Sequence, residues 1–293
     1  MDTTASSRSQ SINSTLRLFQ IYSRTRYLSI KHDSYFQVYE QVLGRFVGQD
    51  ITFVEVGIFN GGSLFMWREY FGPRARIIGI DLNPAARQWE SDGFEIFIGS
   101  QSDPVFWRDF YAKVGKVDVL LDDGGHTNRQ QIITVHESLP HINDGGVILV
   151  EDVHCSYMRE FGNPSRFSFI NLAKRIVDCV NSRSSALGRV RNDYEQRVYA
   201  VSFYESIVVL LVDSRRCFPG QFTSNGGISA DREDFRLQGT PAAAVESFRA
   251  RLRRHFGALR RWPLVEPVGK AVFAVIDRIA FAIDGRKLKR FFD

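Results

Sequence analysis

The chain has 293 residues, of which 44% are hydrophobic and 24% are charged, which is enough for one large globular domain with or without an appendage. Its three cysteines lack metal-ligand spacing, which argues against a disulfide framework or a zinc ribbon and suits a reducing compartment. Residues 1–15 lack the apolar core of a signal peptide, and no run of 18 apolar residues occurs. We therefore expect a cytoplasmic protein.

The net charge of +5 is unevenly distributed along the chain. From Glu246 to Asp293, twelve Lys or Arg residues face five Asp or Glu residues, a net charge of +7 that leaves −2 for the rest of the chain. A basic tail on a slightly acidic body is not the charge pattern of a nucleic-acid-binding domain. We expect no nucleic-acid partner.

The N-terminal part of the chain predicts helices over residues 16–50. Residues 31–34 resemble a turn. After it, apolar and aromatic residues recur at helical spacing: Tyr35, Val38, Tyr39, Val42 and Phe46. We expect these side chains to pack in the core rather than to contact a ligand. Residues 1–15, rich in Ser and Thr, are expected to be disordered.

Five short apolar runs that alternate with helical segments predict a parallel sheet within residues 51–213. The runs cover 51–57, 76–80, 94–98, 117–121 and 146–150. Their alternation with helices favours a right-handed, doubly wound α/β fold. A later apolar stretch, 198–213, is predicted to contain two strands that are joined too tightly for a parallel crossover and must pair antiparallel. We expect a mostly parallel, seven-stranded sheet with an antiparallel last strand, which a nicotinamide dehydrogenase would not have.

A glycine-rich turn follows the first predicted strand. Gly57, Gly61 and Gly62 lie between this strand and a helical segment, where the backbone can approach a ligand at the helix N-terminus. Their spacing is not that of a dinucleotide-binding G-x-G-x-x-G motif. The second strand ends at Asp81, where a carboxylate can accept hydrogen bonds from both ribose hydroxyls of a nucleoside. The turn and Asp81 together indicate a nucleoside-containing cofactor.

Two further strands end in carboxylates and a histidine. One run ends in Asp122, Asp123 and His126, and the helix of residues 127–139 is expected to begin at His126. The next run ends in Glu151 and Asp152. Because parallel strands present their carboxyl ends at one edge of the sheet, we expect these acids to share a crevice. Acids gathered in this way repel each other strongly without a cation. The pattern therefore predicts a metal site.

The same residues carry a resemblance to known enzymes. Glu55-Val56-Gly57 with Gly61-Gly62, Asp81 and the final hairpin resemble class I S-adenosylmethionine methyltransferases. The stretches 122–127 and 151–157 resemble more narrowly the metal-dependent sugar O-methyltransferases of macrolide biosynthesis and their cephalosporin-pathway relatives, over roughly residues 26–213. The resemblance implies that Mg²⁺ or another divalent cation is held by Asp123, Glu151 and Asp152. It also implies that His126 is the general base.

We expect the remaining candidates to lie on the cofactor side of the site: Glu55, Gly57, Gly61, Ser63, Asp81, Gln101, Asp103 and Asp122. Asp103 has a second interpretation, because it precedes Pro104 and can simply cap the next helix. Asp122 is expected either behind the metal ligands or beside the cofactor.

The expected activity is S-adenosylmethionine- and Mg²⁺-dependent O-methylation of a sugar hydroxyl on a glycosylated natural product, a glycolipid or a polysaccharide precursor. A hydroxyl is a poor nucleophile at neutral pH, so a Lewis acid and a base are both useful to this reaction. Two alternatives stay open. The acceptor could be a catechol-like vicinal diol, although catechol methyltransferases have Asp-Asn at the strand end where this chain has Glu151-Asp152. The chain could also be a non-catalytic binding module on the same fold.

Beyond residue 213, residues 214–240 read as a linker and residues 241–293 as a basic tail of two amphipathic helices, expected at 242–262 and 268–283. One interpretation is that the helices pack on the domain or on another subunit, and we expect a homo-oligomer. The other is peripheral contact of residues 242–293 with anionic lipid at the inner membrane face, which would bring the enzyme to a lipid-linked sugar acceptor.

Overall fold

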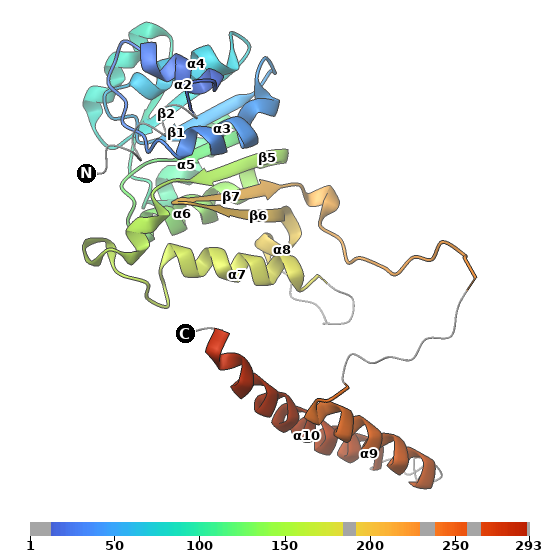
Figure 1. The fold of residues 1–293 in the computed structure, drawn as a ribbon. Helices are drawn as coiled ribbons and strands as arrows, with labels where there is room; N and C mark the ends of the chain where they lie inside the picture. Colours follow the sequence, from blue (N-terminus) through green and yellow to red (C-terminus); the bar gives the residue numbers. More distant parts are fainter. Residues whose placement is uncertain (1–12, 184–191, 229–237, 257–264, 292–293) are drawn as a thin grey trace. The chain divides into compact units, whose positions relative to one another are not determined.

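The computed structural model describes residues 13–183, 192–228, 238–256 and 265–291. The chain forms two compact units, Met1–Phe222 and Thr223–Asp293, which are described separately (Figure 1). Disorder was expected for residues 1–15, of which 1–12 lie outside the described residues, as do 229–237 of the predicted linker and 257–264 and 292–293 of the predicted tail. Asn13 is buried, and its side-chain amide donates to the carbonyl oxygen of Asp33 at 2.7 Å.

Seven strands of the first unit form one sheet in the order β3-β2-β1-β4-β5-β7-β6. The strands are β1 Thr52–Val56, β2 Arg76–Asp81, β3 Glu95–Ile98, β4 Val117–Asp122, β5 Ile142–Val150, β6 Val198–Tyr204 and β7 Ile207–Val212. All neighbouring pairs from β3 to β5 are parallel, and β7 is antiparallel to both β5 and β6. The predicted doubly wound sheet with an antiparallel last strand is confirmed. Strand order reverses between β1 and β4, the place where open α/β sheets bind ligands.

The helices of the first unit are α2 Arg17–Arg24, α3 Tyr35–Leu43, α4 Gly62–Phe71, α5 Pro104–Val114, α6 Asn128–Ser138, α7 Phe169–Asn181 and α8 Asp193–Arg197. Short 3₁₀ segments join them at Gly44–Phe46, Pro84–Asp92, Leu139–His141, Val153–Tyr157, Arg159–Phe161 and Ser214–Arg216. The predicted N-terminal helices are present as α2 and α3.

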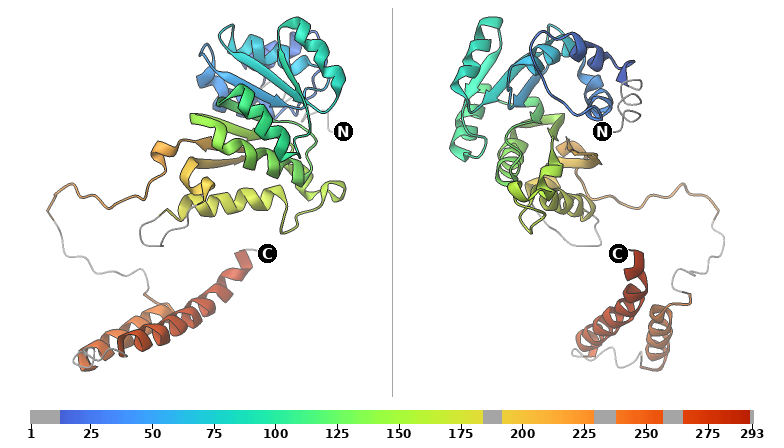
Figure 2. Two further views of the ribbon diagram at one scale, coloured as in Figure 1. Left: turned by 180° about the vertical axis from the view of Figure 1, so that it is seen from behind. Right: turned by 60° about the vertical axis from the view of Figure 1, so that its left-hand side comes forward.

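Alternate residues of the central strands point to opposite faces of the sheet, as the pleat requires. Phe53, Val119 and Leu149 belong to a core that includes residues of α2, α3 and α4. Their neighbours Val54 and Leu120 belong to a second core that includes residues of α5, α6 and α7. Helices cover both faces of the sheet (Figure 2). The central strands are therefore apolar along most of their length, and polar side chains gather at the strand ends.

The turn of the β6–β7 hairpin consists of Glu205 and Ser206, and Ser206 has a left-handed φ of 60°. A connection of two residues is too short for a parallel crossover and can join only antiparallel strands. The predicted antiparallel pairing is confirmed. The turn also brings Ser206 to the carboxyl end of β5, where the backbone N–H of Val153 donates to its carbonyl oxygen.

The second unit contains two helices, α9 Pro241–Phe256 and α10 Val265–Leu288, followed by a 3₁₀ turn at Lys289–Phe291. Arg249 of α9 joins the helices, because its Nη2 lies 2.6 Å from Oδ2 of Asp277 and its guanidinium lies 4.8 Å from the ring centre of Phe273. Within the described residues, no helix is both long enough and apolar enough to cross a bilayer.

Candidate active site at the strand ends

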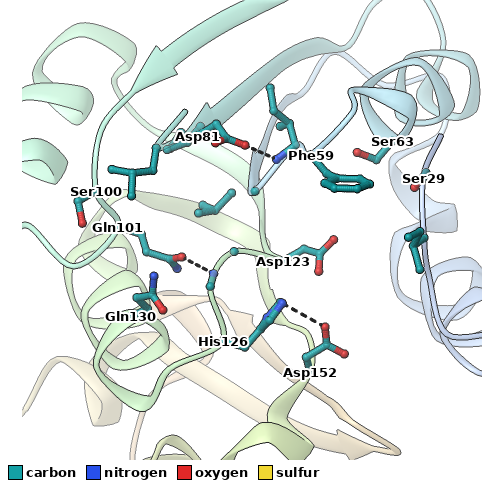
Figure 3. A pocket seen from close by; sticks show the side chains of 18 of the residues that line it. Ser29, Phe59, Ser63, Asp81, Ser100, Gln101, Asp123, His126, Gln130 and Asp152 are labelled. Atoms are coloured by element: carbon teal, nitrogen blue, oxygen red, sulfur yellow. Dashed lines mark hydrogen bonds and ion pairs between the residues drawn. The ribbon is translucent and has the colours of Figure 1, made fainter. Parts of the chain in front are cut away.

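A cavity of about 510 Å³ lies at the carboxyl ends of β1, β2 and β4 (Figure 3). Seven of the predicted site residues line it: Gly57, Ser63, Asp81, Gln101, Asp123, His126 and Asp152. Five others do not: Glu55, Gly61, Asp103, Asp122 and Glu151. Residues 28–30, which precede α3, close one side of the cavity. The structure thus brings seven of the predicted residues, from both the cofactor and the metal groups, around one space.

The glycine turn after β1 has no room for side chains. Gly57 has a φ of +84°, and an added Cβ would lie 2.2 Å from the carbonyl oxygen of Asp123. Gly61 has a φ of +77°, and its Cβ would lie 2.3 Å from the ring of Trp89. Both positions need glycine for backbone conformation and for space. Gly61 therefore shapes the turn from behind, whereas Gly57 faces the cavity.

Asp81 is fixed at the tip of β2. Its Oδ2 accepts a hydrogen bond from the backbone N–H of Ile58 at 3.1 Å, and its Oδ1 accepts one from Asn83 at 2.8 Å. Phe59 and Leu82 line the same cavity, although they are 66% and 67% exposed. A carboxylate between two exposed apolar side chains suits a ribose and its flat base.

Gln101 and Asp122 hold the loop that follows β4. The side-chain amide of Gln101 donates to Oδ1 of Asp122 at 2.8 Å and accepts from the backbone N–H of Gly125 at 2.9 Å. Oδ1 of Asp122 also accepts from the N–H of Gly124 at 3.2 Å. Burial raises the pKa of Asp122 to about 6, against the opposing effect of these hydrogen bonds. Asp122 thus supports the loop that presents Asp123 and His126.

Asp103 caps α5, because its Oδ1 accepts from the backbone N–H of Val105 at 2.9 Å. Its side chain is used in the cap and it lies outside the cavity lining, so the helix-cap interpretation describes it better than cofactor contact.

The prediction that a helix begins at His126 is wrong. Thr127 and Gln130 form a capping box, so α6 begins at Asn128 and His126 lies before the cap with a left-handed φ of 57°. This conformation directs His126 into the cavity, where its Nε2 lies 3.4 Å from Oδ2 of Asp152. Its Nδ1 is buried without a hydrogen-bond partner among the described residues.

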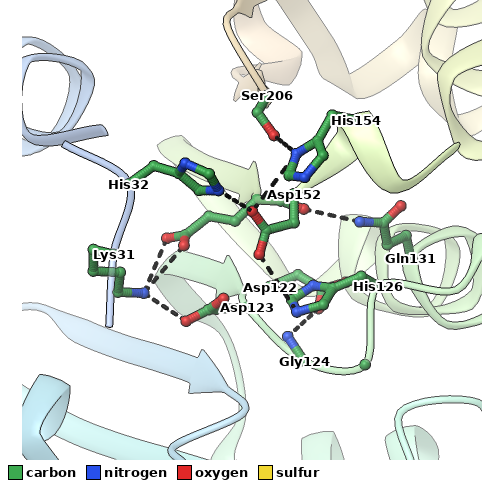
Figure 4. Close-up of polar contacts among 12 residues, drawn as sticks. Lys31, His32, Asp122, Asp123, Gly124, His126, Gln131, Asp152, His154 and Ser206 are labelled. Atoms are coloured by element: carbon green, nitrogen blue, oxygen red, sulfur yellow. Dashed lines mark hydrogen bonds and ion pairs between the residues drawn. The ribbon is translucent and has the colours of Figure 1, made fainter. Parts of the chain in front are cut away.

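Asp152 also has a left-handed backbone, with φ 53° and ψ 34°. The hydroxyl of Tyr35 donates to its Oδ1 at 2.5 Å. His32 Nε2 and His154 Nδ1 lie 3.7 and 3.8 Å from the same oxygen, and His154 contacts the Ser206 hydroxyl (Figure 4). Left-handed conformations of non-glycine residues are costly and gather at functional sites. Phe59, His126 and Asp152, which share this conformation, all line the cavity.

Lys31 stands among the acids that the sequence placed in a metal site (Figure 4). Its Nζ lies 2.6 Å from Oδ2 of Asp123 and 3.1 Å from Oε2 of Glu151. Only 1% of its side chain is exposed. The sequence analysis missed Lys31, because a lysine in a polar turn ordinarily points to water. The excess of acids at the strand ends could have indicated Lys31, because clustered acids are stabilised by a buried cation.

Burial and charge act in opposite directions at this cluster. Burial disfavours the ammonium, but Asp123, Glu151 and Glu55 outweigh it and raise the pKa of Lys31. Burial and the nearby Asp123 raise the pKa of Glu151 well above its ordinary value. Lys31 and the Tyr39 hydroxyl, which donates a hydrogen bond to Glu151, act in the opposite direction and lower this pKa. Tyr39 was expected only to pack in the core, and it also contacts the site.

The acids and His126 fit a cation. Asp123, His126 and Asp152 each offer a ligand atom, and these atoms all lie within 4.8 Å of one another. Glu151 is fully buried, and its carboxylate is directed to Lys31 and Tyr39. Carboxylate oxygens are the ligands that Mg²⁺ prefers, and an imidazole suits transition metals better.

Comparisons with known proteins agree with this geometry. The sequence profile of the family described as "Methyltransferase domain" matches residues 54–153. This segment contains the glycine turn, Asp81 and both acidic strand ends. Residues 54–153 are thus identified as similar to a methyltransferase domain.

Several proteins named as O-methyltransferases are similar to this chain. The 2′-O-methyltransferase of 8-demethyl-8-α-L-rhamnosyl tetracenomycin C from Streptomyces olivaceus is 29% identical, over 70% of this chain and 57% of its own length. Demethylmacrocin O-methyltransferase from Streptomyces fradiae is 26% identical, over 67% of this chain and 54% of its own length. This chain thus spans little more than half the length of these relatives.

A solved structure shares the fold. The MycE methyltransferase of the mycinamycin biosynthetic pathway, in complex with Mg, SAH and mycinamycin VI, superposes with a TM-score of 0.63 at 21% identity. The superposition covers 70% of this chain and 55% of MycE.

Glu55 makes the stability of the first unit depend on pH. Burial raises its pKa from 4.5 to about 7, against the opposing effect of Lys31. The folded state therefore holds a proton that the unfolded state releases, so this contribution to stability is present below pH 4.5 and is lost as the pH rises to about 7. In the metal-free parent, the free energy of unfolding should therefore fall by on the order of 3 kcal/mol over this pH range, and Glu55→Gln should remove that fall.

Denaturant unfolding between pH 4.5 and pH 8 measures the effect, with Glu90→Gln as the exposed control. Parallel pH profiles for the parent and Glu55→Gln would contradict the assignment.

Proposed function

We propose that the protein is an S-adenosylmethionine- and divalent-cation-dependent O-methyltransferase of a sugar hydroxyl. The supporting observation is that one cavity is lined both by the glycine turn with Asp81 and by Asp123, His126 and Asp152. One similar protein is named as the 2′-O-methyltransferase of a rhamnosyl tetracenomycin, which favours a glycosylated natural product over a catechol. A glycolipid or a polysaccharide precursor offers the same kind of hydroxyl.

The cofactor binds in this proposal along the turn from Gly57 to Ser63, with its ribose on Asp81 and its base between Phe59 and Leu82. When bound, S-adenosylmethionine supplies a methyl group on a sulfonium. Gly57 allows the backbone to approach the cofactor, and Gln101 supports the loop below it. Glu55 and Asp122 support the residues that line the cavity and do not contact the cofactor themselves, because both are buried and lie outside the cavity lining.

The acceptor hydroxyl lies in this proposal between the sulfonium and the acidic end of the cavity. When bound, a divalent cation supplies a Lewis acid that makes the hydroxyl more acidic. Asp123 and Asp152 already face the cavity, and Glu151 is the third ligand that the sequence motif predicts. His126 takes the proton, and Asp152, 3.4 Å from Nε2, stabilises the imidazolium that forms.

Transfer of a radiolabelled methyl group tests the proposed function. The enzyme is given labelled S-adenosylmethionine and a rhamnosylated aromatic polyketide or a glycosylated macrolide, with and without a chelator. We expect transfer that the chelator stops, while calorimetry shows that cofactor binding survives, because Gly57 and Asp81 are not among the ion's proposed ligands. Cofactor affinity that disappears with the ion would contradict this separation, and transfer to a catechol alone would favour the alternative acceptor.

Replacing His126 by Ala should lower turnover by about 10² to 10⁴, the usual contribution of a general base. Cofactor and cation affinities should stay close to those of the parent, whereas Asp123→Asn should weaken cation binding. Single-turnover kinetics and calorimetry separate these effects. A fully active His126→Ala enzyme would remove the base assignment, and a His126→Ala enzyme that loses the cation would make His126 a ligand.

We also propose that the unit Thr223–Asp293 contacts anionic lipid at the inner membrane face, near a lipid-linked acceptor. Four residues of α10 at helical spacing are about half exposed and form one apolar stripe: Val272, Val275, Ile279 and Ile283. Exposed basic residues accompany it, including Arg278, Arg286 and Lys289. An apolar stripe with basic neighbours suits an anionic interface.

Removing the residues after Thr240 should release the protein from anionic vesicles and leave methylation of a soluble acceptor unchanged. Vesicle flotation measures binding, with neutral vesicles and high salt as controls because both remove the charge attraction. Binding that survives truncation would remove the lipid proposal. A change of oligomeric state on truncation would support subunit packing in a homo-oligomer instead.

A further inference from the structure

Lys31 brings one positive charge into contact with three strand-end acids. Its ammonium comes from the segment before α3, and the acids come from β1 and from the residues that directly follow β4 and β5. Besides its contacts with Asp123 and Glu151, it lies 3.8 Å from Oε1 of Glu55. Glu55 and Glu151 are fully buried. Buried carboxylates at these distances must be protonated or paired with a cation, and the Lys31 ammonium supplies that cation when the protein holds no metal.

The ammonium contacts two of the three carboxylates that we propose as ligands of the divalent cation. It donates hydrogen bonds to Oδ2 of Asp123 and to both carboxylate oxygens of Glu151. Asp152 instead contacts Tyr35 and the histidines. A divalent cation that used Asp123 and Glu151 would require the same oxygens. Two cations cannot share them closely without strong repulsion.

We propose that Lys31 is a resident cation of this acid cluster, which holds Asp123 and Glu151 in the absence of a divalent cation and competes with that cation for them. Lys31 is thereby a positioning residue that keeps the ligands ordered and lowers the affinity for the metal. The inference rests on the proposed function in one respect, namely that a divalent cation binds at these acids.

Glu55 gives the displaced ammonium another partner. Its carboxylate accepts from the Ser63 hydroxyl at 2.8 Å and from Trp67 Nε1 at 3.2 Å, so it is held in place. Glu55 lies outside the cavity lining and is not a proposed ligand. A small movement of Nζ away from Asp123 and toward Glu55 would keep the ammonium paired while the divalent cation binds.

The test uses Lys31→Met, which keeps the length and apolar stem of the side chain and removes its charge. Without metal, the variant should melt at a lower temperature than the parent, because the acids lose their cation. Mn²⁺ should bind about tenfold more tightly or better, because its competitor is gone and the cluster is more negative. Mn²⁺ should therefore raise the melting temperature of the variant more than that of the parent.

Two further variants complete the design. Lys113→Met removes an exposed lysine of α5 and should change neither quantity. Glu55→Gln removes the alternative partner of the ammonium and should weaken Mn²⁺ binding relative to the parent. Mn²⁺ affinity unchanged in Glu55→Gln would overturn the movement of the ammonium toward Glu55.

Unchanged or weaker Mn²⁺ binding in Lys31→Met would overturn the competition. If Lys31→Met does not fold without metal, Lys31→Met/Glu151→Gln restores the charge balance and should fold. A double variant no more stable than the single one would overturn the proposal. These readouts are melting temperatures and cation affinities, so they stay meaningful if the protein transfers no methyl group, and the absence of Mn²⁺ binding in the parent would refute the metal site itself.

Discussion

The contact between the Lys31 ammonium and the carboxylates of Asp123 and Glu151 is the interaction on which the site depends. Parallel strands covered on both faces place their first polar side chains at their ends, and the switch in strand order brings three such ends together. Acids collected in this way would repel each other in a buried setting. An ammonium from the N-terminal segment makes the arrangement compatible with a folded, metal-free protein.

The local conformations around the cavity serve the same arrangement. Phe59, His126 and Asp152 all have left-handed backbones, a conformation that costs on the order of 1–3 kcal/mol for each such residue. His126 is directed into the cavity by the capping box that begins α6, and Asp152 is held by Tyr35. The first unit thus uses helix caps, a hairpin turn and aromatic hydroxyls to position a small set of polar groups.

Patterns within single segments predicted most of the fold. The apolar runs identified β1 to β5, and the tight connection before Ile207 identified the antiparallel hairpin. Gly57 and Asp81 were predicted as facing a ligand because a turn and a strand end have local signatures. Lys31, Tyr35 and Tyr39 were missed as site residues because their contacts with Glu151 and Asp152 span 112 to 120 residues of sequence. The start of α6 was misplaced because Thr127 rather than His126 forms the cap.

In the proposed site, the strand-end acids hold one divalent cation beside the cofactor cavity. Counting bound Mn²⁺ by electron paramagnetic resonance, in the parent and in Asp123→Asn, tests it most directly. We predict one tightly bound ion for each parent chain and a marked loss of binding in Asp123→Asn. A parent chain that binds no Mn²⁺, or an Asp123→Asn chain that binds it as tightly as the parent, would contradict the account.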